Sequence, residues 1–298
     1  MPARGAAPAD DGSGERVAPV RASEPSADTV PKTSLPADGS DGSSDIPAYF
    51  HSNERLSLPD LSGYERIRFL TTTDFPPFNF IDQTGRLTGF NIDLARGLCE
   101  ELDIVDRCQI QALPFDDLTG ALSTGKGEAV IAGLAVTQKQ RERFTFTRSY
   151  LHLPARFVRN RATSLDGTPA IALSGKPVGV VKGSAHAAML RAFFPKLAAK
   201  PFDTADAMLD ALRSRKIDAA FGDGVRLSFW LSSKQAKECC AFFGGPYLSE
   251  HFLGHGLAIA VDEKHRDLAE AFDHALLSMT RDGRFAEIYQ RYFPSGLY

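Results

Sequence analysis

Two patterns of apolar and polar positions alternate along most of the chain. The stretch Ile67–Thr71 is short and apolar, which is typical of a strand. After Gly89, apolar residues recur every four positions at Phe90, Leu94 and Leu98, which predicts an amphipathic helix. Residues 129–136 form an unbroken apolar run, which predicts a strand buried on both faces.

A second series of the same kind follows Gly175. Residues 177–181 and 217–221 have the pattern of strands. Between them, Gly183-Ser184 is a signal for a helix start, and a further helix is expected around residues 207–212. The alternation of strands and helices in both series predicts an α/β architecture with two lobes.

Polar residues mark several helix boundaries. Thr137 and Gln140 have the spacing of a capping box, and Asp116 is expected to cap a helix that ends at Gly125. Asp223 follows the strand at 217–221, where its default role is to cap the next helix. Near the end, a last helix is predicted from apolar residues that share one face: Leu268, Phe272, Leu276 and Met279.

Composition and charge exclude two classes of protein. The chain has 298 residues with 34 basic and 37 acidic side chains, a formal net charge of −3. A nucleic-acid binder that relies on a basic face is therefore not expected. No stretch approaches the roughly 18–20 apolar residues of a membrane helix, so an integral membrane protein is not expected either.

The first part of the chain has a different composition from the rest. Residues 1–45 are rich in Pro, Gly, Ser, Ala and Asp and contain few large apolar side chains. Such a segment cannot bury enough apolar surface to offset its conformational entropy. We therefore assign residues 1–60 to a disordered tail or tether. No apolar signal core follows Met1, so an export signal has been removed, the start is misplaced, or the protein is cytosolic with a loose terminus.

Four cysteines leave the redox state open on sequence grounds. Cys99 lies on the helix after Gly89 and Cys108 lies just before the next strand, so they can form a helix–loop disulfide or remain buried thiols. Adjacent cysteines such as Cys239 and Cys240 rarely bond to each other, and one of them can be a core residue. The absence of a C-x-x-C pair argues against a zinc or thioredoxin-type site.

Catalytic signatures are sparse. The chain has no G-x-S-x-G elbow, no P-loop and no G-x-G-x-x-G after a strand. His251 and His255 are four residues apart in a stretch broken by glycines, outside any expected helix, so solvated histidines are favoured over metal ligands. Phe75, Phe78 and Phe115 are core residues by default.

Four separated segments resemble the family 3 extracellular solute-binding proteins, the amino-acid receptors of ABC importers. Residues 73–78 and 88–94 are similar to the family pattern YPPF…GFDVDL. The other segments that carry the resemblance are residues 115–118 with 133–150, residues 178–184 and residues 216–223, and the ending around 283–294 also fits. The similarity covers roughly residues 64–298 in the right order.

The resemblance implies two lobes joined by two hinge-crossing strands, with the ligand enclosed between them. Lobe one would comprise residues 64–153 plus 247–298, and lobe two residues 154–246. Receptors of this family for lysine, arginine and ornithine have a disulfide at the position of Cys99 and Cys108. The resemblance therefore favours that bond, and with it the periplasm.

The resemblance also assigns a ligand site. An ammonium group would bind Asp223, and Gly183 and Ser184 would present amides and a hydroxyl at a helix start. The aromatic rings of Phe75 and Phe115 would enclose the ligand side chain. The remaining positions expected to bind ligand are Gly133, Ala135 and Arg141.

The sequence departs from the family pattern at several of these positions. The carboxylate-binding arginine is expected three residues after Thr137, where this chain has Gln140 and places Arg141 one residue later. One helical step rotates a side chain by about 100°. Ala135 and Ala185 replace hydroxyl donors, and Thr72 stands where receptors for basic amino acids have an aspartate, which disfavours lysine or arginine. Lys182 and His186 instead suggest an acidic or modified ligand, or are solvated.

The function predicted from these residues is capture of a small polar solute, an amino acid above all, for an ABC permease. The protein would be a periplasmic monomer that is not an enzyme, has no cofactor and no metal, and binds no nucleic acid. The alternatives are a cyclohexadienyl-dehydratase-like enzyme on the same fold, with Asp223 or His186 as general acid, and a periplasmic accessory or sensor module.

Overall fold

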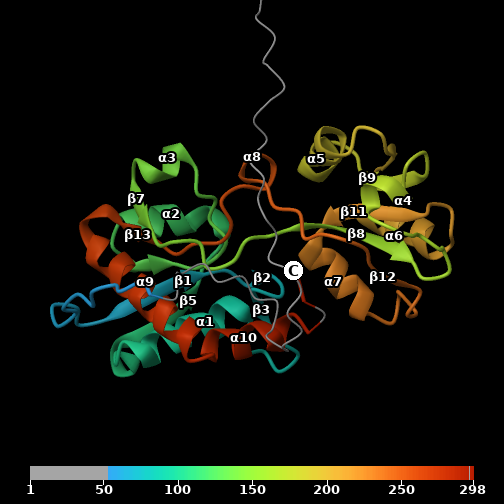
Figure 1. The fold of residues 1–298 in the computed structure, drawn as a ribbon. Helices are drawn as coiled ribbons and strands as arrows, with labels where there is room; N and C mark the ends of the chain where they lie inside the picture. Colours follow the sequence, from blue (N-terminus) through green and yellow to red (C-terminus); the bar gives the residue numbers. More distant parts are fainter. Residues whose placement is uncertain (1–52, 295) are drawn as a thin grey trace, which may run out of the picture. The chain divides into compact units, whose positions relative to one another are not determined.

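Two five-stranded sheets organise the part of the chain that the structure describes, residues 53–294 and 296–298 of a computed structural model (Figure 1). The first sheet has the order β5-β1-β6-β13-β7. Strands β5, β1 and β6 run parallel, and β13 runs antiparallel to both of its neighbours. The five strands are β1 (Ile67–Thr71), β5 (Cys108–Ala112), β6 (Ala129–Val130), β7 (Phe144–Phe146) and β13 (Ala260–Asp262).

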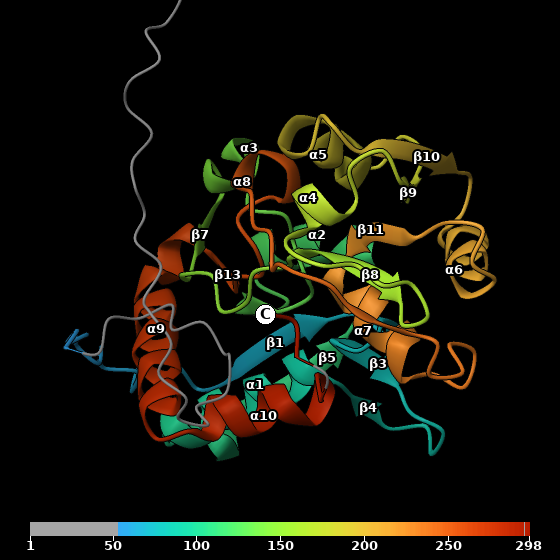
Figure 2. The same cartoon turned by 45° about the vertical axis from the view of Figure 1, so that its right-hand side comes forward.

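Helices pack on the first sheet, and apolar side chains of the strands and helices together form the core. Figure 2 shows α1, α9 and α10 together near β1, and these three helices contact one another. Their buried face includes Phe90, Leu94 and Phe272, which are fully excluded from solvent. The helices here are α1 (Phe90–Glu101), α2 (Phe115–Ser123), α3 (Gln138–Arg141), α9 (Arg266–Arg281), α10 (Arg284–Tyr292) and the 3-10 turns η1 (Val105–Arg107) and η2 (Glu263–His265). A small antiparallel sheet precedes α1: β2 (Asp74–Phe75), β3 (Asn79–Ile81) and β4 (Leu87–Thr88).

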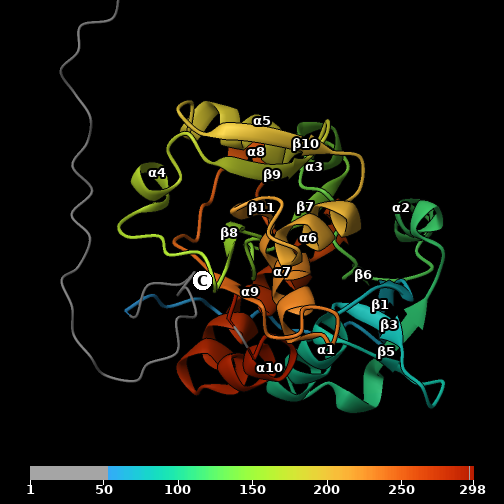
Figure 3. The same ribbon diagram turned by 90° about the vertical axis from the view of Figure 1, so that its right-hand side faces the viewer.

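The second sheet has the order β10-β9-β11-β8-β12. Strands β10, β9 and β11 are parallel, so their carboxyl ends lie at one edge of the sheet (Figure 3). Strands β8 and β12 complete it in antiparallel pairing. Its strands are β8 (Ala155–Asn160), β9 (Pro177–Val181), β10 (Ala198–Phe202), β11 (Ala219–Asp223) and β12 (Cys240–Phe242). Its helices are α4 (Pro169–Ala172), α5 (Ala185–Phe193), α6 (Ala205–Arg213), α7 (Gly224–Ser232) and α8 (Glu250–Leu253).

Two segments connect the sheets, as the crossing strands of the expected fold would. One joins β7 to β8 and the other joins β12 to β13 (Figure 1). They run antiparallel to each other through the bridges Leu151↔Leu257 and Ala155↔Tyr247. Helix α8 belongs to the second connection and falls in the range 247–298, which the resemblance assigns to lobe one. Its residues Phe252 and Leu253 pack instead against the core of the second sheet.

Local signals predicted several boundaries correctly and others wrongly. Strands at Ile67–Thr71 and Pro177–Val181 and the helix after Gly89 are confirmed. The strand predicted for residues 129–136 ends at Val130, because the chain turns at Gly133, whose φ of +75° is left-handed. Pro114, not Asp116, is the residue before α2, and Asp116 lies in the first turn of that helix.

The predicted tail falls partly on described residues. Its first 52 residues lie outside the description, but Glu54, Leu56 and Leu61 contact the rest of the described chain. Glu54 pairs with Arg148 at 2.5 Å, and Leu56 contacts the core. Leu61 is only 7% exposed. The boundary of the tail at residue 60 was therefore placed too late.

Both cysteine pairs are bonded in the structure. Cys99 and Cys108 have Cα atoms 6.2 Å apart and form the disulfide that the resemblance favoured. Cys239 and Cys240 are also bonded, against our expectation for neighbours, and Cys240 is a core residue in β12. Among the described residues, no helix combines the length and apolarity that a membrane span requires.

Candidate functional site

Asp223 has two structural roles at the carboxyl end of the second sheet. It is the last residue of β11 and the N-cap of α7, where its carboxylate accepts a hydrogen bond of 2.8 Å from the amide of Arg226. Its side chain also lines a cavity of about 510 Å³. The default interpretation as a helix cap is therefore confirmed, and the same carboxylate remains available to a ligand in the cavity.

The cavity is built from the segments that follow three parallel strands. Ser184 follows β9, Asp203 follows β10 and Asp223 ends β11. Ligands commonly bind at this edge of α/β sheets, because loops after parallel strands meet there. Ser184 caps α5 by accepting a 3.1 Å bond from the amide of Ala187, and it donates to the carbonyl of Val181 at 2.7 Å. The turn before it uses Gly183 with φ of +72°.

The charges in this cavity are unevenly balanced. Three aspartates line it (Asp203, Asp206 and Asp223) against one arginine, Arg226, whose guanidinium pairs with Asp206 at 2.9 Å. His186 also lines the cavity. Burial lowers the pKa of its imidazole, an effect that nearby Asp223 partly opposes. The lowered pKa favours the neutral imidazole, and the three aspartates outnumber the one arginine, so the cavity has an excess of acidic side chains.

The predicted ligand-binding residues near the first sheet, Phe75, Phe115, Gly133 and Ala135, do not line the cavity at Asp223. Phe75 in β2 packs against Phe78, with ring centroids 4.7 Å apart. A Cβ atom at Gly133 would lie 2.8 Å from the Phe75 ring, so only glycine leaves that ring in place. Phe115 is the first residue of α2, and it is 46% exposed, which is a large fraction for an aromatic residue. Ala135 is exposed, and its carbonyl accepts a bond from the amide of Thr137.

Arg141 does not share a cavity with Asp223. It lies on α3 and lines a different cavity of about 410 Å³, together with His152, Glu250 and Asp273. Thr137 caps α3 by accepting a hydrogen bond from the backbone amide of Gln140, as the capping box predicted. Gln140 and Arg141 are therefore consecutive residues of one helix. The structure thus brings Ser184 and Asp223 together in one cavity, with Gly183 in the turn before Ser184, and places Phe75 beside Gly133, whereas Arg141 lines a different cavity.

Thr72 belongs to a buried polar network and not to a cavity wall. Its hydroxyl accepts a bond of 2.5 Å from the amide of Asn79, whose oxygen accepts from Asn91 at 2.9 Å. The Tyr150 hydroxyl donates to Asn91 at 2.8 Å. Because Thr72 is 2% exposed, its identity says little about the charge of a ligand. Thr72 therefore gives no reason to exclude a basic ligand.

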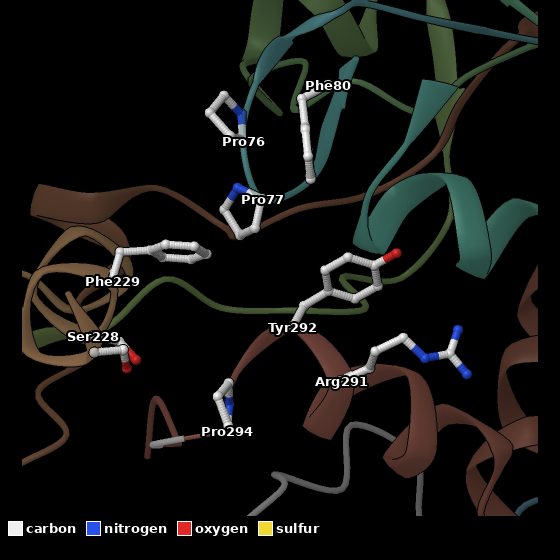
Figure 4. A pocket seen from close by; sticks show the side chains of 9 residues that line it. Pro76, Pro77, Phe80, Ser228, Phe229, Arg291, Tyr292 and Pro294 are labelled. Atoms are coloured by element: carbon white, nitrogen blue, oxygen red, sulfur yellow. The ribbon is translucent and has the colours of Figure 1, made fainter. Parts of the chain in front are cut away.

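A third cavity, of about 350 Å³, is predominantly apolar. Figure 4 shows Phe229 of α7 pointing toward Tyr292, with Pro77 beside them. The guanidinium of Arg291 points away and pairs with Asp93 at 2.6 Å. None of the predicted ligand-binding residues lines this cavity, which distinguishes it from the acidic cavity at Asp223.

His251 and His255, the two histidines of the stretch broken by glycines, lie in different kinds of backbone. His251 lies on α8, contrary to the expectation that neither is helical, and His255 lies beyond Gly254. The His255 ring is 3.3 Å from the carboxylate of Glu250. Within the described residues, no group of three or more His, Cys, Asp or Glu side chains could hold a metal ion.

Asp203, Asp206 and Arg226 were not anticipated from the sequence. Each sits in a position with an ordinary local explanation: Asp203 and Asp206 flank the start of α6, where acidic residues are favoured. The signal that identifies them is topological, since the loop after β10 must reach the same sheet edge as Gly183 and Asp223. That inference requires the strand order, which a single sequence did not supply.

Comparisons with known proteins agree with this fold. The model of bacterial extracellular solute-binding proteins, family 3, matches residues 67–295. The putative ABC transporter arginine-binding protein 2 of Escherichia coli is 33% identical over 232 residues, which cover 77% of this chain and 91% of that protein. The L-arginine-binding protein of Pseudomonas aeruginosa is 29% identical over 246 residues, 82% of this chain and 93% of that protein.

Solved structures also share the two-lobed α/β fold. The second substrate-binding domain of a putative amino acid ABC transporter from Streptococcus pneumoniae has a TM-score of 0.67 at 23% identity, covering 76% of this chain and 100% of that one. The L-cystine solute receptor of Neisseria gonorrhoeae has a TM-score of 0.68 at 16% identity, covering 78% of this chain and 94% of that one.

Proposed function

Because the chain belongs to family 3 of the bacterial extracellular solute-binding proteins, we propose that it captures an amino acid in the cavity at Asp223 for delivery to an ABC permease. The family and the similar curated proteins are binding proteins, which agrees with the expectation that the chain is not an enzyme. The relatives named for arginine, and the lysine/arginine/ornithine-binding periplasmic protein of Escherichia coli, make basic amino acids the first candidates. Action in the periplasm, as a monomer, is part of the proposal.

The observation that carries this proposal is the position of Asp223. Its carboxylate lines the cavity at the carboxyl ends of three parallel strands, and two further aspartates line the cavity against one arginine. An ammonium group is the natural partner of such a carboxylate, because charge-assisted hydrogen bonds are the stronger kind. Phe75, Phe115 and Gly133 of the first sheet, with Ala135 nearby, are proposed to contact the rest of the ligand, and Gly183 and Ser184 to contact its polar end.

A calorimetric titration with free amino acids tests the proposal. We expect L-arginine or L-lysine to bind and to raise the melting temperature, since a ligand that binds only the folded state stabilises it. L-Glutamate serves as the control of opposite charge and should give no heat. Binding of none of the 20 amino acids would overturn the proposal. Gel filtration with and without ligand tests the monomer.

A further inference from the structure

Loop closure does not account for the disulfide between Cys239 and Cys240. A disulfide stabilises a protein mainly by restricting the unfolded chain, and adjacent residues enclose almost no loop. Their Cα atoms are 3.7 Å apart because a peptide bond joins the two residues, whereas disulfides usually span about 4.4–6.8 Å between Cα atoms. Bonds outside that range are easier to reduce. Cys99 and Cys108, at 6.2 Å, lie within it, so the adjacent pair is the more reducible of the two.

The turn before this pair has an unfavourable backbone conformation. Lys237 and Glu238 have φ angles of +49° and +55°. Residues other than glycine remain in this left-handed region only where the surrounding structure holds them there. The hydrogen bonds within the turn are few: the amide of Cys239 donates to the carbonyl of Ala236 at 3.0 Å, and the amide of Ala236 donates to that of Ser233 at 3.2 Å. A disulfide that begins at the next residue is therefore one of the constraints on Lys237 and Glu238.

The pair lies where the turn meets the second sheet. Cys240 is the first residue of β12, is 3% exposed and pairs with Asn160 of β8. Arg161 donates to both cysteine carbonyls, from its amide to Cys239 at 2.8 Å and from Nε to Cys240 at 3.1 Å. The sheet thus holds Cys240 independently of the disulfide. Cleavage of the S–S bond would leave β12 paired and remove a constraint on the turn alone.

We propose that Cys239–Cys240 is a redox-sensitive switch whose reduction releases the turn at residues 233–238, between α7 and β12 (Figure 1). The reductant is a dithiol. One of its thiolates attacks Sγ of Cys239, the partly exposed residue of the pair, and Sγ of Cys240 leaves with the bonding electrons and takes a proton. The second thiol of the reductant then attacks the mixed disulfide and releases Cys239. Two electrons pass to the pair, and the dithiol becomes a disulfide. The switch lies outside the cavity at Asp223 and does not depend on the proposed function.

A redox titration of the full chain with reduced and oxidised dithiothreitol tests the switch. At each ratio, free thiols are alkylated and identified by mass spectrometry. We expect Cys239 and Cys240 to be alkylated at a ratio of reduced to oxidised reagent at least about tenfold lower than Cys99 and Cys108. Where only the adjacent pair is reduced, amide hydrogen exchange in residues 233–242 should be at least about tenfold faster, because exchange follows local opening. Reduction of Cys99–Cys108 first or at the same ratio, or unchanged exchange after reduction of the adjacent pair, would overturn the proposal.

The double variant Cys239→Ala/Cys240→Ala reproduces the cleaved state without a reductant. Urea denaturation followed by the emission of Trp230, the single tryptophan of the chain, shows whether the fold is retained. We expect fast exchange in residues 233–242 and no further change on adding dithiothreitol. Exchange as slow as in the unmodified protein would show that the disulfide does not hold the turn.

Cys99→Ala/Cys108→Ala is the matched control, because it removes the disulfide of the other sheet and keeps the adjacent pair. Its exchange in residues 233–242 should be slow without dithiothreitol and should increase with it as in the unmodified protein. Fast exchange there without reductant would mean that loss of either disulfide loosens the turn, which would overturn a specific role of the adjacent pair. If the variant at Cys239 and Cys240 does not fold, the titration of the unmodified chain decides.

Discussion

The Asp223 carboxylate accepts a 2.8 Å hydrogen bond from the backbone amide of Arg226, so one side chain both begins α7 and lines the acidic cavity. A carboxylate has acceptor capacity for both tasks. Its two roles have different chemical requirements, however. The cap needs an oxygen acceptor, whereas an ammonium ligand needs the charge. Substitutions at this position can therefore separate stability from binding.

Replacing Asp223 with Asn should abolish binding while preserving the helix cap. Asn is about as good an N-cap as Asp, so the free energy of unfolding should change little. Loss of the charge should weaken binding by roughly 2–5 kcal/mol, which is measurable by calorimetry.

Asp223→Ala serves as the comparison, because it removes both functions. Besides the loss of binding, it should lose about 0.5–2 kcal/mol of stability in chemical denaturation. Unchanged affinity in the Asn variant would mean that the ligand does not present an ammonium group to this carboxylate.

Much of the fold could be predicted because its signals are local. Thr137, Ser184 and Asp223 are helix caps that depend only on the residues beside them. The run at 129–136 was misinterpreted because buried irregular backbone and buried strand have the same apolar composition. The turn at Gly133 becomes evident only from its φ.

The candidate site was predictable only in part. A family pattern located Asp223 and Ser184, which follow strands directly. It could not decide between Gln140 and Arg141, because one helical step changes the direction of a side chain by about 100°. The acidic groups at 203 and 206 depend on strand order, which is a long-range property of the fold.

The Cys99–Cys108 disulfide should stabilise the first lobe. The two residues are nine apart in sequence. Closing a loop of this size lowers the entropy of the unfolded chain, which stabilises the folded state by about 2–3 kcal/mol. The double variant Cys99→Ala/Cys108→Ala should lose stability of that order in urea denaturation under non-reducing conditions.

Mass spectrometry of the non-reduced protein should also recover the linked peptide that contains Cys99 and Cys108. Free alkylation of both thiols in protein isolated without reductant would contradict the bond. The double variant at Cys239 and Cys240 is the comparison, since adjacent residues enclose almost no loop and the entropic effect should be small.

Asp273 should make the protein less stable as the pH rises from about 4 to 6. Burial raises the pKa of its carboxyl to about 6, although the amide and guanidinium of Arg148 partly oppose the shift. Between the unfolded pKa of 3.8 and this value, the folded state binds more protons than the unfolded state. The cost of ionisation is therefore fully present above pH 6 and is relieved in acid.

The variant Asp273→Asn removes this cost while keeping an acceptor for the Arg148 amide, which lies 2.9 Å from the carboxylate. In urea denaturation it should be more stable than the unmodified protein at pH 7.5, and the difference should disappear near pH 3.5. Asp282 provides a control of opposite sign, because the hydrogen bond from Arg284 lowers the pKa of its carboxyl. A difference for Asp273→Asn that does not vary with pH would contradict the prediction.

The segment from Glu54 to Leu61 should be required for stability, whereas residues 1–45 should not. Leu61 is buried in the core, the Leu56 carbonyl lies 2.8 Å from a His274 ring nitrogen, and Arg281 donates to the carbonyl of Glu54. A chain that begins at Ile46 should unfold at the same urea concentration as the full chain. A chain that begins at Ser62 should lose about 3 kcal/mol, since each fully buried leucine contributes roughly 1.5–3 kcal/mol.

Point variants in the same segment distinguish packing from a general effect of truncation. Leu56→Ala removes a side chain that packs against the core, while Leu58→Ala removes one that is 53% exposed. We expect the first variant to lower the free energy of unfolding by about 1–2 kcal/mol, because Leu56 is only partly buried, and the second to change it by less than about 0.5 kcal/mol. Equal effects of the two variants would show that this segment does not contribute to the core. A lower free energy of unfolding already in the chain that begins at Ile46 would show that residues before Ile46 contribute to stability.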